Sequence, residues 1–419
     1  MNGSVHRVNV HVINTGSELL LGDVVNTHLS FIARAILPLG LRVARQFTVP
    51  DGPAIADALR TSFGEAQIVF VTGGLGPTTD DITRETAAEL LQLELHLDAD
   101  VANAITLRLA ARKIELTDRI LRQAQVPHGA VTLANEHGTA PGLYVAANAA
   151  LHGKSPHLFL LPGPPRELQP MFKTGVLQIL KRIAPPQEQI DFQTFRLAGI
   201  GESVIEKKVG PQILALEGVE LGYCARPAEV DVRIIGPSSS VKKAARILDR
   251  EFQSSIFTST GESLEMVVIR LLTTKRALLA TAESCTGGLL AHRLTNVPGS
   301  SAAYAGGYVT YANELKSDSL GVAASVIEKY GAVSKQVAIA MAEGARARAH
   351  TDFALATTGI AGPAGGTPEK PVGTVYVALA RENAPTKVQR FFFPNDRETF
   401  KQMATQFALE MLRQSLTAL

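Results

Sequence analysis

Residues 280–288 read ATAESCTGG, and this stretch organises the last third of the chain. The apolar run before it predicts a buried strand, and the leucine spacing of residues 289–294 predicts a helix after it. Ser284 is therefore expected on a sharp strand-to-helix turn, where the amides of Gly287 and Gly288 can face an anion or a developing oxyanion. The alternative is an ordinary helix N-cap, a position that serine and threonine commonly occupy.

Length, composition and charge limit the class of protein. The 419 residues exceed one ordinary domain, and 46% apolar with 19% charged residues is typical of a globular α/β protein. The net charge of +2 predicts no direct binding to nucleic acid or to a membrane. The two cysteines, Cys224 and Cys285, form neither a disulfide framework nor a zinc pattern. Without a signal-like apolar core or a membrane-length run, the sequence predicts a cytoplasmic protein.

Strand and helix patterns alternate through the first ninety or so residues, which predicts a doubly wound α/β sheet. Residues 67–72, QIVFVT, form a continuous apolar run that is typical of a buried parallel strand. Ligands bind such sheets at the carboxyl ends of the strands. The loops after the first strand and after residues 67–72 therefore mark the expected binding edge.

The second of these loops, residues 73–81, reads GGLGPTTDD. Its glycines let backbone amides approach a phosphate, and its paired aspartates can hold a hard cation beside it. The glutamate of the loop after the first strand can join them. The residues predicted for this site are Gly73, Gly74, Gly76 and Glu18 for substrate, with Asp80 and Asp81 for metal. The alternative is that the aspartates cap the next helix and the glycines only make the turn.

Three further residues of the first domain carry weaker signals. Arg166, in the loop at residues 162–168, can contact an anion or begin a solvated helix. His128 and His137 lack the spacing of metal ligands and are interpreted as hydrogen-bonded loop residues.

A linker is predicted at residues 185–189, PPQEQ, followed by a β-α-β-β-α pattern that resembles a KH-type module. Residues 199–202 read GIGE and are not the GXXG loop that clamps a nucleic-acid backbone. The module is therefore interpreted as a spacer or dimer element, with Cys224 as a small core residue. The expected domains are residues 1–184, 185–257 and 258–419.

The last domain contains a candidate Ser-Lys pair. Lys316 can deprotonate Ser284 if burial or neighbouring charge lowers its pKa, and the alternative is a solvated helix lysine. Tyr311 can share the proton relay or pack against the helix. Cys285 is an adjacent rival nucleophile.

Other residues of the last domain complete the candidate site. His292 and His350 are expected to be surface or core residues and not general bases. Residues 358–367 can offer backbone donors to a phosphate, and an arginine further on can offer a charged one. The residues predicted to bind substrate here are Gly287, Gly288, Asn313, Thr358, Gly359, Gly362, Gly365, Gly366 and Arg397.

These motifs resemble the CinA family of competence- and damage-inducible proteins, over essentially the whole chain. In the first half they are GSELLLG at residues 16–22, GGLGPTTDD at 73–81, GTAPG at 138–142 and PGPPREL at 162–168. In the second half they are ESCTGGLL at 283–290, VPGSS at 297–301, YANELK at 311–316, GAVS at 331–334, TGIAGPAGGT at 358–367 and KPVGTVY at 370–376.

The resemblance implies two activities. The last domain would be a nicotinamide-mononucleotide (NMN) deamidase that needs no cofactor, with Ser284 as the acyl-forming nucleophile, Lys316 as its base and Tyr311 in support. The first domain resembles molybdopterin-binding folds and would hydrolyse ADP-ribose to AMP and ribose 5-phosphate, with a divalent metal at Asp80 and Asp81 and with potassium. His28 stands where the family pattern has Asn, which would affect the first activity if this position contacts substrate.

A second interpretation belongs to a different class. The family name points to DNA uptake and recombination, so the chain can be a non-catalytic partner protein, and the middle module suggests a homodimer. Salt-dependent DNA binding would favour this interpretation, and NMN turnover would favour the enzyme.

Overall fold

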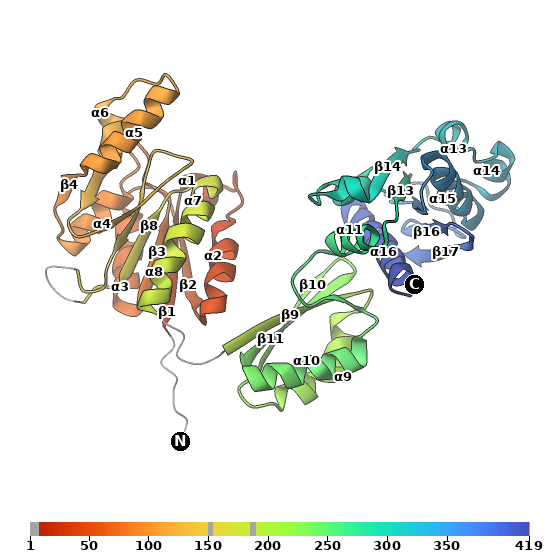
Figure 1. Cartoon of the computed structure of the whole chain (residues 1–419), viewed down its shortest axis with the longest axis horizontal. Helices are drawn as coiled ribbons and strands as arrows, with labels where there is room; N and C mark the ends of the chain where they lie inside the picture. The colour runs from red at the N-terminus through yellow and green to blue at the C-terminus, as the bar shows by residue number, and fades with distance from the viewer. Residues whose placement is uncertain (1–7, 150–153, 185–189, 419) are drawn as a thin grey trace. The chain divides into compact units, whose positions relative to one another are not determined.

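The computed structural model describes residues 8–149, 154–184 and 190–418 (Figure 1). The chain divides into two compact units, Met1–Ile190 and Asp191–Leu419. The linker predicted at residues 185–189 lies outside the described residues. None of the described helices combines the length and the apolarity needed to cross a membrane.

The first unit contains a six-stranded sheet in the order β2-β1-β3-β8-β7-β6. Four strands are parallel: β1 (Asn9–Thr15), β2 (Arg42–Val49), β3 (Ile68–Thr72) and β8 (His157–Leu161). Strands β7 (Gly142–Val145) and β6 (Val131–Leu133) continue it antiparallel, and β4 (Leu95–Leu97) pairs separately with β5 (Gln125–Pro127). The predicted doubly wound fold is confirmed.

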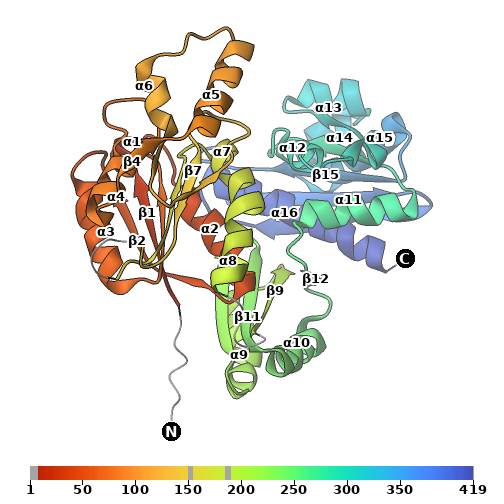
Figure 2. The ribbon, with the colours of Figure 1, turned by 60° about the vertical axis from the view of Figure 1, so that its left-hand side comes forward.

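Alternation along the central strand explains why helices cover both faces of this sheet. Ile68 and Phe70 pack in one core with α2 (His28–Ile36) and with the continuous helical segment α7 (Pro165–Met171), Phe172–Val176 and α8 (Leu177–Ile183). Val69 and Val71 pack in a second core with α3 (Ala54–Glu65) and α4 (Thr83–Leu91) (Figure 2). The remaining helices are α1 (Ser17–Leu21), α5 (Ala99–Ala111) and α6 (Asp118–Leu121).

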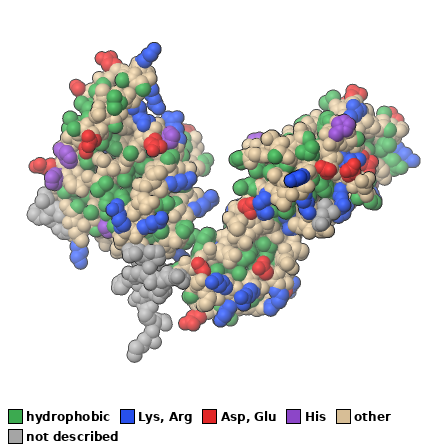
Figure 3. Space-filling view, in the orientation of Figure 1, with side chains coloured by type: hydrophobic (Ala, Val, Ile, Leu, Met, Phe, Trp, Pro, Cys, Tyr) green, Lys and Arg blue, Asp and Glu red, His purple; other side chains and the backbone are tan. Residues whose placement is uncertain are grey.

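The second unit begins with a small α+β module. Its sheet has the order β10-β11-β9-β12, built from β9 (Ile190–Ala198), β10 (Glu220–Arg226), β11 (Glu229–Pro237) and β12 (Ile256–Thr258). Helices α9 (Glu202–Leu214) and α10 (Ser238–Phe252) cover one face, where Val232 and Ile234 enter the core. Figure 3 shows Lys and Arg side chains gathered on the module, and the exposed basic residues of α10 are Lys242, Lys243, Arg246 and Arg250.

The prediction that Cys224 is a core residue is wrong, because this cysteine is exposed. Cys224 pairs across the strands with Asp231, so both side chains lie on the same face of the sheet. The core side chains Val230 and Val232 alternate with Asp231 and lie on the opposite face. Strand alternation therefore keeps Cys224 out of the core.

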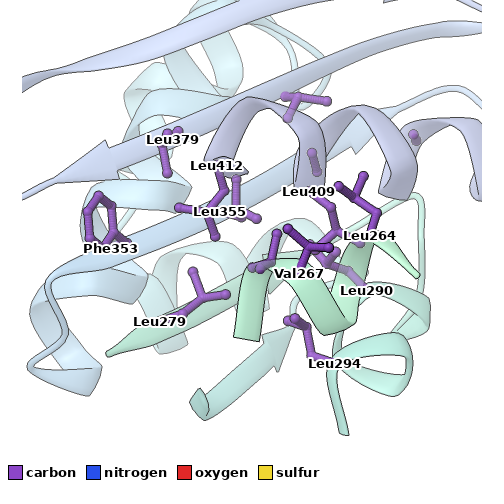
Figure 4. Packing of buried hydrophobic residues seen from close by; sticks show 14 of the residues in the cluster. Leu264, Val267, Leu279, Leu290, Leu294, Phe353, Leu355, Leu379, Leu409 and Leu412 are labelled. Atoms are coloured by element: carbon purple, nitrogen blue, oxygen red, sulfur yellow. The ribbon is translucent and has the colours of Figure 1, made fainter. Parts of the chain in front are cut away.

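The rest of the second unit is a five-stranded sheet in the order β14-β13-β15-β16-β17. Strands β13 (Leu279–Glu283), β14 (Tyr304–Val309) and β15 (Phe353–Gly359) are parallel, and β16 (Thr374–Arg381) and β17 (Ala384–Phe392) are antiparallel to their neighbours. Figure 4 shows Leu279, Leu355 and Leu379 packing against α11 (Leu264–Lys275) and α16 (Arg397–Thr417).

The other face of this sheet carries small residues. Ala280, Ala282 and Ala354 leave room for close packing of α15 (Lys335–Ala349), through residues such as Met341. Helices α13 (Asn313–Leu320) and α14 (Ala324–Tyr330) complete this side, and α12 (Leu289–Thr295) follows β13.

Polar contacts join the middle module to the last domain within the second unit. Gln406 of α16 donates to Glu229 of β11 over 2.9 Å, and Arg413 donates to the Ser254 carbonyl over 2.6 Å. The two parts therefore share a side chain network as well as one compact unit.

Candidate functional sites

Ser284 follows β13 at the carboxyl edge of the last sheet. Its amide donates to the carbonyl of Thr357 on the neighbouring strand over 2.9 Å, which fixes the start of the turn. The N-cap of α12 is Gly288, four residues later. The alternative interpretation of Ser284 as that helix's N-cap is therefore wrong, and its hydroxyl is not used to begin the helix.

The capping group is the buried carboxylate of Glu283, which sequence reasoning did not single out. Its Oε2 accepts from the Thr286 hydroxyl over 2.7 Å and from the amides of Gly288 and Leu290 over 3.0 Å each. Its Oε1 accepts from the Ala291 amide over 2.8 Å. A negative charge is favourable here because the first helical amides lack partners inside the helix and carry partial positive charge. A glutamate that ends a buried strand just before two glycines is the signal that could have revealed it.

The amides of Gly287 and Gly288 are both occupied by acceptors within the protein, so the expectation that they are free to bind an anionic ligand or an oxyanion is wrong. The Gly287 amide donates to the Ser284 carbonyl over 3.2 Å, and the Gly288 amide is held by Glu283. Both glycines instead supply positive φ angles, 59° and 94°, that side chains rarely adopt. Their role in this structure is to shape the turn.

Ser284 and Lys316 line one pocket of about 210 Å³. Of the residues predicted for this site, the pocket brings together Ser284, Tyr311, Asn313, Lys316, Thr358, Gly359 and Arg397. Cys285, Ala332, Val333 and Ala361 complete its described lining, which does not include Gly287, Gly288, Gly362, Gly365 or Gly366. The pocket thus gathers a hydroxyl, an amine, a phenol and a guanidinium from three separate segments of the chain, with the phenol and the amine both from residues 311–316.

Lys316 is fully buried, so the interpretation of a solvated helix lysine is wrong. Its Nζ donates to the carbonyls of Thr310, Tyr311 and Ala312 over 3.0, 3.2 and 3.4 Å. Burial lowers the pKa of Lys316, and the neighbouring Cys285 and Glu314 oppose this shift. The three carbonyls also favour the ammonium, because they match its three N–H donors. Among the described residues the Ser284 hydroxyl makes no hydrogen bond with this amine.

Tyr311 and Arg397 form a pair at the pocket. Arg397 donates to the Tyr311 hydroxyl over 2.8 Å and to the Gly362 carbonyl over 3.0 Å. Tyr311 is 60% exposed, so the alternative of packing against the helix does not hold. Since α16 begins at Arg397 and is capped by Asp396, the guanidinium is held beside a helix N-terminus. The pair places positive charge where an anionic ligand group can reach it.

Cys285 is the weaker of the two adjacent nucleophile candidates. The thiol is buried, and this burial raises its pKa to about 12. Because the thiolate is the reactive form of cysteine, Cys285 is held in its unreactive form at neutral pH.

The first unit has a larger pocket, of about 450 Å³, at the carboxyl ends of its parallel strands. Of the predicted residues, Glu18, Gly73, Gly74, Gly76 and Asp81 line this pocket. Asp80 is exposed and is not part of the described lining. A side chain at Gly73 would meet the Thr15 carbonyl at 2.6 Å, so the loop needs glycine to lie this close to β1.

The carboxylates at this pocket do not converge. Asp81 accepts hydrogen bonds from the Thr78 amide, over 2.9 Å, and from the Thr78 hydroxyl, which braces the loop. Within the described ranges no three His, Cys, Asp or Glu side chains lie close enough together to hold a metal ion. A magnesium ion bound by one or two carboxylates and substrate phosphates does not need such a cluster, so the lining carboxylates still suit one.

Several further residues line the first pocket. Arg166 and His137 both do, and for Arg166 this favours the anion-contact alternative. Asp51 also lines this pocket, and its carboxylate accepts a hydrogen bond from the Ser17 amide over 3.2 Å. It was not predicted from the sequence because its Asp-Gly-Pro context is typical of a turn. Burial raises the pKa of Asp51, and Glu18, Asp80 and Asp81 add to the shift. His128, by contrast, is not part of the described lining, and its ring makes an edge-to-face contact with the ring of His96.

His28 does not belong to the described lining of this pocket. Its Nδ1 lies 3.0 Å from the hydroxyl of Thr72, which also accepts from the Asn14 amide group over 2.8 Å. Burial lowers the pKa of His28, which keeps the ring neutral near pH 7. His28 therefore lies outside the described pocket lining and contacts the last residue of β3, Thr72.

Comparison with known proteins assigns each part of this architecture to a class. Residues 11–182 match a model described as a probable molybdopterin binding domain, residues 193–259 match the damage-inducible protein CinA KH domain, and residues 261–416 match the CinA C-terminal domain. The first unit thus has a molybdopterin-binding-like fold, followed by a KH-like module and a CinA C-terminal domain.

Relatives align with the chain over nearly its whole length. A CinA-like protein of Akkermansia muciniphila is 44% identical and covers 96% of each chain. A putative competence-damage inducible protein of Moorella thermoacetica is 40% identical and covers 97% of this chain and 98% of its own. A crystal structure of competence/damage inducible protein CihA from Agrobacterium tumefaciens is 40% identical, covers 38% of this chain and 99% of its own, and has a TM-score of 0.35. The chain belongs to the CinA family.

Proposed function

We propose that the last domain hydrolyses the carboxamide of NMN to give nicotinate mononucleotide and ammonia. The observation that carries the proposal is the single pocket lined by Ser284, Lys316, Tyr311 and Arg397. It combines a nucleophile, a base with a lowered pKa and a fixed cation. Arg397 suits the phosphate of the nucleotide, and Asn313, Thr358 and Gly359 offer polar groups for the rest of the ligand.

In the proposed reaction the Ser284 hydroxyl oxygen attacks the carboxamide carbon while Lys316 takes the hydroxyl proton. The carbon–nitrogen bond then breaks, the lysine returns the proton to the leaving amine, and ammonia departs. Water attacks the resulting ester, with Lys316 again as base, and releases the carboxylate and free Ser284. Tyr311, polarised by Arg397, supports the proton transfers.

Lys316 must be neutral to accept the proton. A neutral amine keeps two N–H donors, so one of its three carbonyl contacts must be given up. The contact with Ala312 is the longest, at 3.4 Å, and is the weakest of the three. A small rotation of the amine would then turn its lone pair toward the pocket. No cofactor is needed in this scheme.

We further propose that the first unit hydrolyses ADP-ribose to AMP and ribose 5-phosphate. The glycine-rich loop, Arg166 and the carboxylates of Glu18, Asp51 and Asp81 around one pocket support this proposal. One or two of these carboxylates, together with the substrate phosphates, would hold a divalent metal ion, and that ion and potassium would neutralise the pyrophosphate. Of the two predicted metal residues, Asp81 has the better position and Asp80 would act only after a movement of the loop.

Incubation of the purified protein with NMN and with ADP-ribose, separately, tests both proposals. The expected products are ammonia with nicotinate mononucleotide in the first case, and AMP with ribose 5-phosphate in the second, the latter only with added metal. If NMN or ADP-ribose remains unchanged, the proposed activity of the corresponding domain is refuted.

A different function is favoured by one observation. The exposed Lys242, Lys243 and Arg246 of α10 form a basic strip that suits a polyanion, as a non-catalytic role in DNA uptake would require. Salt-dependent DNA binding that is lost when the three are replaced by Gln would support this role. A cytoplasmic homodimer joined through the middle module completes the proposal, and sedimentation tests the dimer.

A further inference from the structure

We propose that Glu283 is the positioning residue that fixes Ser284 relative to Lys316. This inference rests on the proposed role of Ser284 as nucleophile. It concerns the buried carboxylate of Glu283. This group is neither consumed nor protonated in any step of the proposed reaction.

The side chain of Glu283 sets the path of the turn. Its two oxygens accept four hydrogen bonds, of 2.7 to 3.0 Å, from the turn and from the first residues of α12. The turn between these anchored points contains Ser284. Without the carboxylate, three buried or half-buried amides would lose their acceptor, and the turn would keep its anchor at Thr357 but lose its link to the start of α12.

The backbone of Glu283 sets the position of the base. Its carbonyl accepts from the Thr310 amide over 2.9 Å, and the Thr310 carbonyl in turn accepts from Lys316 Nζ over 3.0 Å. A single residue, Thr310, therefore links the Lys316 amine to the residue before the nucleophile through its own N–H and C=O groups. The side chain and the backbone of Glu283 together hold the two reacting groups at the same pocket.

Glu283→Gln is the sharpest variant because it keeps the size and removes one acceptor. The new NH₂ group must face a backbone N–H that has no other partner nearby. A nucleophile displaced by about 1 Å loses about 100-fold in rate, so we expect kcat to fall by about 10- to 100-fold with KM changed less than threefold. Glu283→Asp keeps the charge on a shorter side chain, and its kcat should lie between the values of wild type and Glu283→Gln.

The test measures the labelling rate of Ser284 by a fluorophosphonate probe, beside NMN turnover and urea unfolding. The probe forms a phosphorus–oxygen bond to the serine and expels fluoride, so it reports the activated hydroxyl without any assumption about substrate. The inference predicts slower labelling in Glu283→Gln and, to a smaller extent, in Thr286→Val, which removes one donor to the carboxylate. Glu328→Gln, an exposed glutamate of α14, is the matched control and should label at the wild-type rate.

The outcomes separate the inference from the proposed function. Wild-type labelling without NMN turnover would refute the amidase proposal while slower labelling of Glu283→Gln would still support the positioning role. Labelling of Glu283→Gln at the wild-type rate overturns the inference, as does a wild-type Ser284 that does not react at all. If Glu283→Gln does not fold, Thr286→Val decides, because equal labelling in that variant and wild type overturns the inference.

Discussion

Lys316 Nζ donates to the carbonyl of Thr310 over 3.0 Å, and Thr310 donates through its own amide to the strand residue before Ser284. The proposed base and nucleophile are thus linked through backbone groups, although they are separated by 31 intervening residues in the sequence. Backbone hydrogen bonds of a packed sheet change little between ligand states, which makes this link a stable reference for both side chains.

Replacement of Lys316 by Met should abolish NMN turnover, with a fall of about 10³-fold or more in kcat. The change also leaves three carbonyls without their donor, so the free energy of unfolding should decrease by about 1–3 kcal/mol. Steady-state kinetics and urea unfolding measure the two effects. A variant with near wild-type turnover would exclude Lys316 as the base.

The rate of NMN hydrolysis should rise with pH as Lys316 loses its proton. Burial lowers the pKa of Lys316 from its ordinary value of 10.5, so the midpoint of this rise in kcat/KM should lie below 10.5. Tyr311→Phe is the control, and it should lower the rate while keeping the same midpoint. A rate that falls over this pH range would mean that the protonated amine is the active form.

Ser284→Ala and Cys285→Ala distinguish the two neighbouring nucleophile candidates. We expect Ser284→Ala to stop ammonia release and Cys285→Ala to retain most of it, because burial raises the pKa of the Cys285 thiol to about 12. Ammonia release and the unfolding midpoint are measured for both variants. The reverse pattern would assign the chemistry to the thiol.

Asp81→Asn should reduce metal-stimulated hydrolysis of ADP-ribose more than Asp80→Asn does. Asp81 lines the pocket and braces the loop through Thr78, whereas Asp80 is exposed. Initial rates at several magnesium concentrations test this order. Equal loss in both variants would show that the loop rearranges when metal and substrate bind.

His28→Asn should make the first unit less sensitive to acid. Burial lowers the pKa of His28 below 6.5, so the unfolded chain binds the proton more readily and stability falls as pH drops from 6.5 toward the folded-state pKa. Asn cannot titrate, so this loss should be absent in the variant. The difference in unfolding free energy between the two proteins is followed from about pH 7 to about pH 5.

His11 and His157 also have pKa values lowered by burial, and their contributions cancel in that difference. An identical pH dependence of wild type and His28→Asn would refute a neutral His28. Because His28 does not line the described pocket, the variant should retain ADP-ribose hydrolysis at neutral pH.

The sequence predicted the layers of the fold because each element has a strong periodic pattern. The apolar run at residues 67–72 and the turn after β13 lie where expected. Cys224 was misplaced because a small apolar residue in a strand does not reveal which face it occupies. Only the pairing with Asp231 decides that.

The candidate site was predicted in type but not in detail. Ser284 could be named from the sequence because it follows a buried strand, and Lys316 because it belongs to the YANELK motif at residues 311–316, which leads into α13. The roles of Gly287 and Gly288 could not, because the acceptor that occupies the Gly288 amide is the side chain of Glu283. Asp51 was missed because its Asp-Gly-Pro context is typical of a turn, and only the order of strands in the sheet brings the end of β2 to the first pocket.

Trapping of the acyl-enzyme tests the central claim most directly. The protein is mixed with NMN, quenched with acid within the first turnover, digested and examined by mass spectrometry. We predict that the peptide containing Ser284 carries the nicotinate mononucleotide acyl group, and that Ser284→Ala gives neither the adduct nor ammonia. Ammonia release at the wild-type rate from Ser284→Ala would contradict the account.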